Sequence, residues 1–267
     1  MKTITFLNQK GGCGKTSSVF HLSGVLAAMG LRVLLVDNDP QASLTQGFLG
    51  PAAMESLDPA VTVAAVYEGD PEPSGLVMPA GPAGVWLAPG SPFATEANMR
   101  PRDHWGDDQW ALRAFTEALH NDFDLCLIDC PPNLHLCSWA ALLAADAVVV
   151  PLQPEDFGSQ GLKPVGASVD AARRANPGLH LAGYLLTMTD KRLAVHATYE
   201  AMLRERYGLL VFTNPVPRAK DFVEAVGARA PVNLYKPKSA ATRAVKAVAD
   251  ELLARAGVAL EGQGVAA

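Results

Sequence analysis

The segment NQKGGCGKTSS, residues 8–18, sets three glycines beside two lysines and a run of hydroxyl side chains. Glycines let backbone N–H groups converge on phosphate oxygens, and the N-terminus of a following helix adds partial positive charge. In such a loop Lys15 reaches the β- and γ-phosphates of a nucleotide, and the Thr16 hydroxyl binds Mg²⁺. The segment therefore predicts a phosphate-binding loop, although Gln9 stands where the usual spacing has a glycine.

Two acidic segments supply the groups that a metal–phosphate site needs. Asp37 in VLLVDNDPQAS ends one apolar run, with Asp39 two residues later, and Asp129 in DLCLIDCPPN ends another. The carboxyl ends of strands in an open α/β sheet are where ligands bind. A strand-end aspartate also helps to hold Mg²⁺ in phosphate-transferring enzymes. Together with the loop, these aspartates predict a site for a metal-bound nucleotide.

A dinucleotide-binding fold is the nearest competing interpretation. Gly12 and Gly14 begin a G-x-G-x-x-G pattern, and Asp37 imitates the ribose-binding acid of that fold. Ser17, however, occupies the place of the third glycine, and Lys15 has no role in that scheme. A serine hydrolase is not supported either, because the chain has no G-x-S-x-G motif.

Elements that would position these residues follow from the alternation of apolar runs and helical patterns. Several runs are apolar throughout, as in strands buried on both faces of a parallel sheet. The alternation predicts a doubly wound, mostly parallel α/β sheet flanked by helices. Strands are predicted at 3–8, 32–37, 84–88, 124–129, 146–151, 181–187 and 208–212, and helices at 14–29, 108–120, 158–175, 192–207 and 239–257.

The whole pattern is interpreted as a single nucleotide-binding domain over residues 1–258. Residues 50–107 are rich in Pro, Gly and Ala, and are predicted to form an irregular excursion with one short strand. Residues 259–267 are predicted to be a flexible tail.

Composition narrows the classes of protein. No run approaches the roughly 18 apolar residues of a membrane span, so no membrane partner is expected. The glycine-rich motif begins too close to Met1 to leave room for a signal peptide. The four cysteines form no C-x-x-C pair, which favours a reduced, cytoplasmic setting. The net charge of −5 is divided unevenly: residues 1–159 carry −11 and residues 160–267 carry +6, so the second part can attract polyanions.

The segments KGGCGKTS, DNDPQAS and IDCPP resemble the three signature segments of the ParA/MinD group of deviant Walker ATPases. VVVPLQPEDFGSQGL, LLTMTDKR and NPVPRAKDFVEAV resemble later segments of ParA, the DNA-partition ATPase. The resemblance extends over about residues 2–250 and is weakest in 50–107. It implies a P-loop NTPase fold, ATP/ADP and Mg²⁺ as ligands, and slow, partner-stimulated ATP hydrolysis.

The resemblance also implies roles for single residues. The lysine matching Lys10 reaches across a nucleotide-sandwich homodimer to the partner's phosphates, where a cation meets the charge that builds on the transferring phosphoryl group. Asp39 matches the residue that orients the attacking water, and Asp37 and Asp129 match aspartates near Mg²⁺, which they hold through water beside Thr16. The implied catalytic residues are Lys10, Lys15 and Asp39. The implied nucleotide-binding residues are Lys10, Gly11, Gly12, Cys13, Gly14, Lys15, Thr16 and Ser17, with Met188 and Pro217 at the adenine.

ParA-type ATPases bind DNA non-specifically as ATP dimers, through basic residues towards the C-terminal side. Such binding neutralises phosphates and falls steeply with salt. Because no helix-turn-helix precedes the first strand, sequence choice is expected to lie with a ParB-like partner, and the protein is expected in the cytoplasm at the nucleoid. The candidate DNA contacts are Lys191, Arg192, Arg218, Lys220, Arg229, Lys236, Lys238, Arg243 and Lys246.

Three alternatives share much of this pattern. The same switch can position a cargo other than DNA, such as a chemoreceptor cluster. A MinD-like protein would end in a membrane-targeting helix, but the stretch ALEGQGVAA after 239–257 lacks bulky aromatics, which favours a helix packed on the sheet. Iron–sulfur relatives need cluster cysteines at a dimer interface, and the glycine-rich cysteine motif around them is absent.

Overall fold

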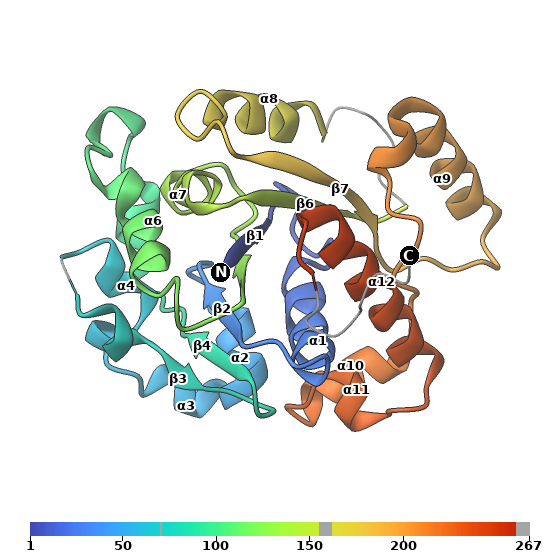
Figure 1. Ribbon diagram of the computed structural model, residues 1–267, viewed down its shortest axis with the longest axis horizontal. Coiled ribbons are helices and arrows are strands. Elements are labelled where there is room, and N and C mark those ends of the chain that lie inside the picture. Colours follow the sequence, from blue (N-terminus) through green and yellow to red (C-terminus); the bar gives the residue numbers. More distant parts are fainter. Residues whose placement is uncertain (70, 155–161, 260–267) are drawn as a thin grey trace.

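A seven-stranded sheet forms the centre of the computed structural model, which describes residues 1–69, 71–154 and 162–259 (Figure 1). The strand order is β3-β4-β2-β5-β1-β6-β7, and neighbouring strands pair in parallel except β3 with β4. The predicted, mostly parallel sheet is therefore confirmed. The strands are β1 (Lys2–Phe6), β2 (Val33–Asp37), β3 (Met78–Pro79), β4 (Val85–Ala88), β5 (Leu125–Asp129), β6 (Ala147–Leu152) and β7 (His180–Leu186).

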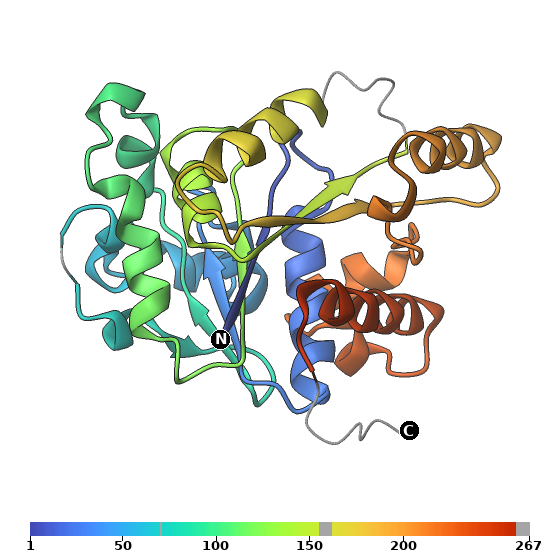
Figure 2. The same ribbon diagram turned by 45° about the horizontal axis from the view of Figure 1, so that its top comes forward.

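Helices cover both faces of this sheet, as the tilted view in Figure 2 shows. One layer contains α1 (Lys15–Ala28), α2 (Ser43–Leu49), α10 (Lys220–Gly227), α11 (Val232–Tyr235) and α12 (Ala240–Ala256). The other contains α4 (Val63–Val66), α5 (Ala94–Met99), α6 (Asp108–Ala118), α7 (Leu136–Ala144), α8 (Leu162–Ala172) and α9 (Ala194–Tyr207). Short elements complete the chain: α3 (Pro51–Glu55) and the 3-10 turns η1 (Pro59–Val61), η2 (Pro73–Leu76), η3 (Arg102–His104) and η4 (Gly208–Leu210).

The apolar strands build two cores because successive strand residues point to opposite faces of the sheet. In β2, Val33 and Leu35 pack with the α1–α12 layer, whereas Leu34 and Val36 pack with the α6–α7 layer. Every residue of β2 and β5 is buried. These central strands fix the sheet edge where their final aspartates lie.

The C-terminal helix α12 packs on the sheet, as expected. Its apolar side chains Val245, Val248, Leu252 and Leu253 are buried in the same core as α1. Within the ranges that the structure describes, no helix is long and apolar enough to cross a membrane. The predicted tail lies outside the described residues from position 260 onward.

Two of the expected elements differ from the structure. The predicted strand at 208–212 is wrong: Gly208 ends α9 with a positive φ, η4 follows, and only Val211 forms an isolated bridge to Tyr184. Residues 50–107 contain more regular structure than expected, because short helices and η turns accompany β3 and β4 there. The first residues of the predicted helix 158–175 lie outside the described ranges.

Candidate functional site

The phosphate-binding loop joins the end of β1 to the first turn of α1. Gly12 and Gly14 have φ values of 73° and 86°, a left-handed backbone that favours glycine. The Lys15 side chain is buried, and its Nζ donates to the carbonyl oxygens of Asn8 and Lys10, both at 3.1 Å. The Lys10 side chain is exposed. The loop thus curls around one buried ammonium group and presents a second lysine at the surface.

Two side chains that sequence reasoning missed hold this loop from the neighbouring strand ends. The Thr187 hydroxyl, after β7, donates to the Cys13 carbonyl oxygen at 2.8 Å. Gln153, after β6, donates its Nε2 to the Gly12 carbonyl oxygen at 2.8 Å and contacts the Met188 sulfur. In the sheet β6 lies next to β1, and β7 lies next to β6. Residues that directly follow such strands lie at the carboxyl edge where ligands bind, and this position could have identified Gln153 and Thr187 from the sequence.

The two strand-end aspartates lie side by side beneath the loop. Asp37 and Asp129 are Cα partners in the parallel register of β2 and β5, and their side chains are fully buried. Asp37 Oδ1 and both carboxylate oxygens of Asp129 have no hydrogen-bond partner in the described part of the chain. Burial and their mutual repulsion raise the pKa of Asp129 well above its usual value, and burial raises the pKa of Asp37 to about 7.

Asp39 extends this acidic site towards the loop. Its Oδ1 accepts the backbone N–H of Gln41 at 2.9 Å, and the side chain is 9% exposed. Burial raises the pKa of Asp39, while the Gln41 N–H and the charge of Lys15 act in the opposite direction. The charge of Lys15 also lowers the pKa of Asp129. The ammonium group of Lys15 therefore lowers the pKa of one carboxyl at the end of β5 and of another in the loop after β2.

The acidic cluster fits a divalent cation because three of its buried carboxylate oxygens have no hydrogen-bond partner among the described residues. Buried carboxylates without partners are costly, and a hard cation with oxygen ligands would relieve that cost. Thr16 lies near enough to Asp129 to lower its pKa, so its hydroxyl adds an oxygen at the same place. Among the described residues, no three His, Cys, Asp or Glu side chains could hold a metal ion together. Water and phosphate oxygens would therefore supply part of the coordination of Mg²⁺ at this site.

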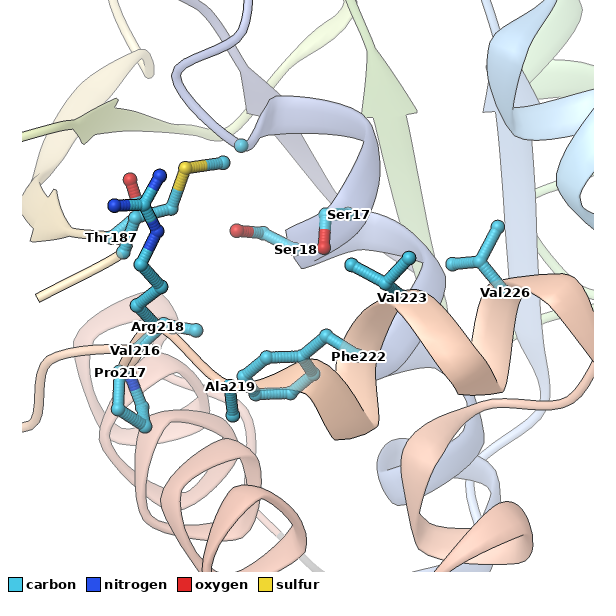
Figure 3. A pocket seen from close by; sticks show the side chains of 12 residues that line it. Ser17, Ser18, Thr187, Val216, Pro217, Arg218, Ala219, Phe222, Val223 and Val226 are labelled. Atoms are coloured by element: carbon cyan, nitrogen blue, oxygen red, sulfur yellow. The ribbon is translucent and has the colours of Figure 1, made fainter.

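A cavity of about 440 Å³ opens beside the loop (Figure 3). The start of α1 forms one wall and α10 the opposite one, with Pro217 and Arg218 at the end. Met188 also lines it, so the structure brings both predicted adenine contacts beside the loop. An apolar slot with polar groups at one end suits a flat base attached to a charged group. Its lining comprises Gly14, Ser17, Ser18, Thr187, Met188, Val216, Pro217, Arg218, Ala219, Phe222, Val223 and Val226.

The candidate DNA contacts lie on several elements of the C-terminal part of the chain. Lys238, Arg243 and Lys246 are exposed at the start of α12, whereas Lys191 and Arg192 precede α9.

Carboxylates or other contacts engage several of the candidates. Lys236 lies between Asp221 and Glu224 at 2.7 and 2.6 Å, and Lys220 lies 3.7 Å from Glu224. Arg192 pairs with Asp190 at 2.6 Å.

Two further candidates lie against other parts of the protein. The Arg229 guanidinium lies against Gly50, and Arg218 lines the cavity beside the loop.

Other reactive side chains are packed in the cores. All four cysteines are buried, and burial raises the pKa of each thiol. None of these four thiols is exposed on the surface of the single chain. His21 is packed between helices: its Nδ1 accepts the Val232 N–H, and burial lowers its pKa to about 4.

Comparisons with known proteins agree with this geometry. A family model described as "AAA domain" matches residues 1–181. The chain is 36% identical over 257 residues to the chromosome-partitioning ATPase Soj of Thermus thermophilus, covering 96% of each chain. It is 32% identical over 264 residues to the chromosome partitioning protein ParA of Caulobacter vibrioides, covering 96% of this chain and 95% of the other.

Among solved structures, a similar one is cobyrinic acid a,c-diamide synthase from Mycobacterium smegmatis, with bound ATP analogue and magnesium. It is 31% identical, has a TM-score of 0.79, and the match covers 95% of this chain and 94% of that one. The relatives, the sheet topology and the glycine-rich loop agree. The chain therefore belongs to the ParA/MinD superfamily of P-loop ATPases, and ATP hydrolysis is its reaction.

Proposed function

We propose that this ATPase binds ATP with Mg²⁺, forms an ATP-bridged homodimer, and binds DNA non-specifically to drive plasmid or chromosome partition. A ParB-like partner would stimulate hydrolysis and so release the DNA. One observation carries the proposal: the buried Lys15, the orphaned carboxylates of Asp37 and Asp129, and a base-sized cavity all meet at one end of the sheet. The partition relatives, at 32–36% identity, support DNA partition as the process that the ATPase drives.

Each group has a chemical role in this proposal. Lys15 exchanges its bonds to the Asn8 and Lys10 carbonyls for phosphate oxygens. Asp39, which is held by the Gln41 N–H, orients the attacking water. Bound Mg²⁺ would neutralise phosphate charge, and Thr16, Asp37 and Asp129 are the residues that would hold it, the aspartates through water.

Lys10 stands at the surface and would meet the partner's phosphates across the dimer. Hydrolysis then depends on dimer formation.

The exposed basic residues around the start of α12 support DNA binding. Lys238 is exposed, and Arg243 and Lys246 are three positions apart, which places them on one side of the helix. Contacts of this kind neutralise phosphates without reading bases. The proposed interface would therefore bind any duplex and weaken steeply with salt.

A DNA-binding assay tests the proposal. Wild-type protein with ATP and Mg²⁺ should retain a random-sequence duplex at low salt, and ADP should abolish the retention. Combined substitution of Arg243 and Lys246 by Glu should abolish it too, while Arg174→Glu, an exposed arginine on the opposite helical layer, should not. Retention independent of nucleotide would refute the dependence on ATP, and retention unaffected by the double substitution would refute DNA binding at this surface. ATP-dependent dimers without any DNA retention would favour a different cargo.

A second candidate function is ATP-dependent amide synthesis, because the synthase from Mycobacterium smegmatis is similar over almost the whole chain. The chain is 36% identical to the partition ATPase Soj and 31% identical to this synthase, which favours the partition function. ATP turnover that depends on added cobyrinic acid and a nitrogen donor would reverse this preference.

A further inference from the structure

Thr45, the third residue of α2, holds one side of the Asp37 carboxylate. Its backbone N–H donates to Asp37 Oδ2 at 2.7 Å, and its hydroxyl donates to the same oxygen at 2.6 Å. Asp37 Oδ1 receives no bond from any described residue. The two oxygens of this carboxylate are therefore distinguished: one is fixed by Thr45, and the other is left for a ligand.

The direction of the Thr45 hydroxyl is set by a third segment of the chain. The backbone N–H of Gly90, just after β4, donates to Thr45 Oγ1 at 2.8 Å. Because the hydroxyl oxygen accepts this bond, its own proton is available for Asp37. A Cβ at Gly90 would lie 2.7 Å from Asp37 Cγ, so the position admits only glycine without displacing the carboxylate. Asp37 is thus confined from two sides.

The same contact closes the loop that carries Asp39. Residues 37–45 leave β2 and return to Asp37 through Thr45. Inside this loop the Gln41 N–H holds the Asp39 side chain, and the Ala42 N–H donates to the Asp39 carbonyl oxygen at 2.8 Å. Thr45 is fully buried, so the closure is shielded from competing water.

We propose that Thr45 is a positioning residue, which orients Asp37 for Mg²⁺ and closes the loop that carries Asp39. The inference rests on the proposed nucleotide–metal site. It adds to that site one residue, Thr45, which acts through Asp37 and does not contact the ligand itself. Outer-shell partners of metal-binding groups typically change metal affinity by about 10–100-fold. Thr45→Val keeps the side-chain shape and the backbone bond but removes the hydroxyl, and it leaves the Gly90 N–H without its acceptor.

Metal affinity, measured without turnover, tests the proposal. Mn²⁺ is titrated into the protein–ADP complex, and the free ion is counted by electron paramagnetic resonance. Thr45→Val should weaken Mn²⁺ binding by about 10-fold or more, while Thr45→Ser restores it. The matched control is Thr116→Val, which removes another buried hydroxyl, one that donates to the Arg113 carbonyl oxygen in α6. It should keep wild-type affinity for Mn²⁺, whatever its effect on the melting temperature.

The possible outcomes distinguish a failure of the Thr45 positioning role from a failure of the proposed metal site. Wild-type Mn²⁺ affinity in folded Thr45→Val overturns the positioning role, as does an equal loss in Thr116→Val. If the wild-type protein binds ADP but no Mn²⁺, the proposed metal site itself fails. If Thr45→Val does not fold, Gly90→Ala tests the same carboxylate from the other side: it should weaken Mn²⁺ binding, and unchanged binding overturns the proposal.

Discussion

Asp37 and Asp129 lie side by side as register partners at the carboxyl ends of two adjacent parallel strands. Neither side chain has an ion-pair partner within the described ranges. Two buried carboxylates at this separation repel each other and resist ionisation. The repulsion between the two carboxylates therefore destabilises their ionised form, and a cation bound with the nucleotide would offset it.

Asp39→Ala should slow ATP hydrolysis by about 100-fold or more and leave nucleotide binding intact, because the carboxylate orients water without contacting the base cavity. Phosphate release and the binding of a fluorescent ATP analogue measure the two effects separately. Asp250→Ala, which removes an exposed carboxylate on α12, is the control and should hydrolyse ATP normally. Undiminished turnover in Asp39→Ala would remove Asp39 from the catalytic residues.

Stability without metal and nucleotide should depend on pH through Asp37. Burial raises its pKa from 3.8 to about 7, so the folded protein retains a proton that the unfolded chain releases. This contribution is fully present below pH 4 and is lost as pH rises through about 7. Relative to Asp37→Asn, the wild-type free energy of unfolding should fall by up to about 1.4 kcal/mol per pH unit in that range. Urea unfolding across pH measures it, and a constant difference between the two proteins would contradict the raised pKa.

Gly14→Ala should disable the phosphate loop at a modest cost in stability. A left-handed alanine costs about 1–2 kcal/mol, and its Cβ would approach the Thr187 side chain to 3.3 Å. We expect nucleotide affinity to fall by at least about 10-fold, because the N–H groups no longer converge on phosphate. Gly166→Ala in α8, where a Cβ meets nothing within 4 Å, is the control. Equal nucleotide affinity in both variants would show that this loop does not bind the phosphates.

Lys10→Ala should reduce ATP-dependent dimers and ATP hydrolysis together. The lysine is exposed beside the loop, and its proposed target is the nucleotide of the partner subunit. Lys163→Ala removes an exposed lysine from α8 and should change neither property. Sedimentation and phosphate release measure both variants. Normal dimers with full activity in Lys10→Ala would exclude a role across the interface.

The sequence predicted the central parts of this fold well, because the signals there are local. Apolar runs that end in aspartate place Asp37 and Asp129 at one sheet edge, and the glycine pattern places Lys15 beside them. Strands that are apolar on both faces occur almost only in parallel sheets covered by helices on both sides. The sequence therefore sufficed to bring the acidic groups and the loop together.

Contacts between distant segments could not be predicted in the same way. Thr45 reaches Asp37 because α2 returns to the end of β2, and Gly90 reaches Thr45 because β4 pairs beside β2. Neither residue belongs to a recognisable chemical pattern. The strand predicted at 208–212 failed for a related reason. An apolar run predicts burial but not pairing, and Leu209 is 94% exposed in a turn that Gly208 begins.

We propose that ATP, held by this site, joins two copies of the chain. Asp39→Ala should stop hydrolysis and preserve that state, so its mass in solution is the most direct measurement. Light scattering after size exclusion should give twice the 28.1 kDa of one chain with ATP and Mg²⁺, and 28.1 kDa with ADP and Mg²⁺. A single-chain mass in both nucleotides, at concentrations that saturate ATP binding, would exclude an ATP-bridged dimer.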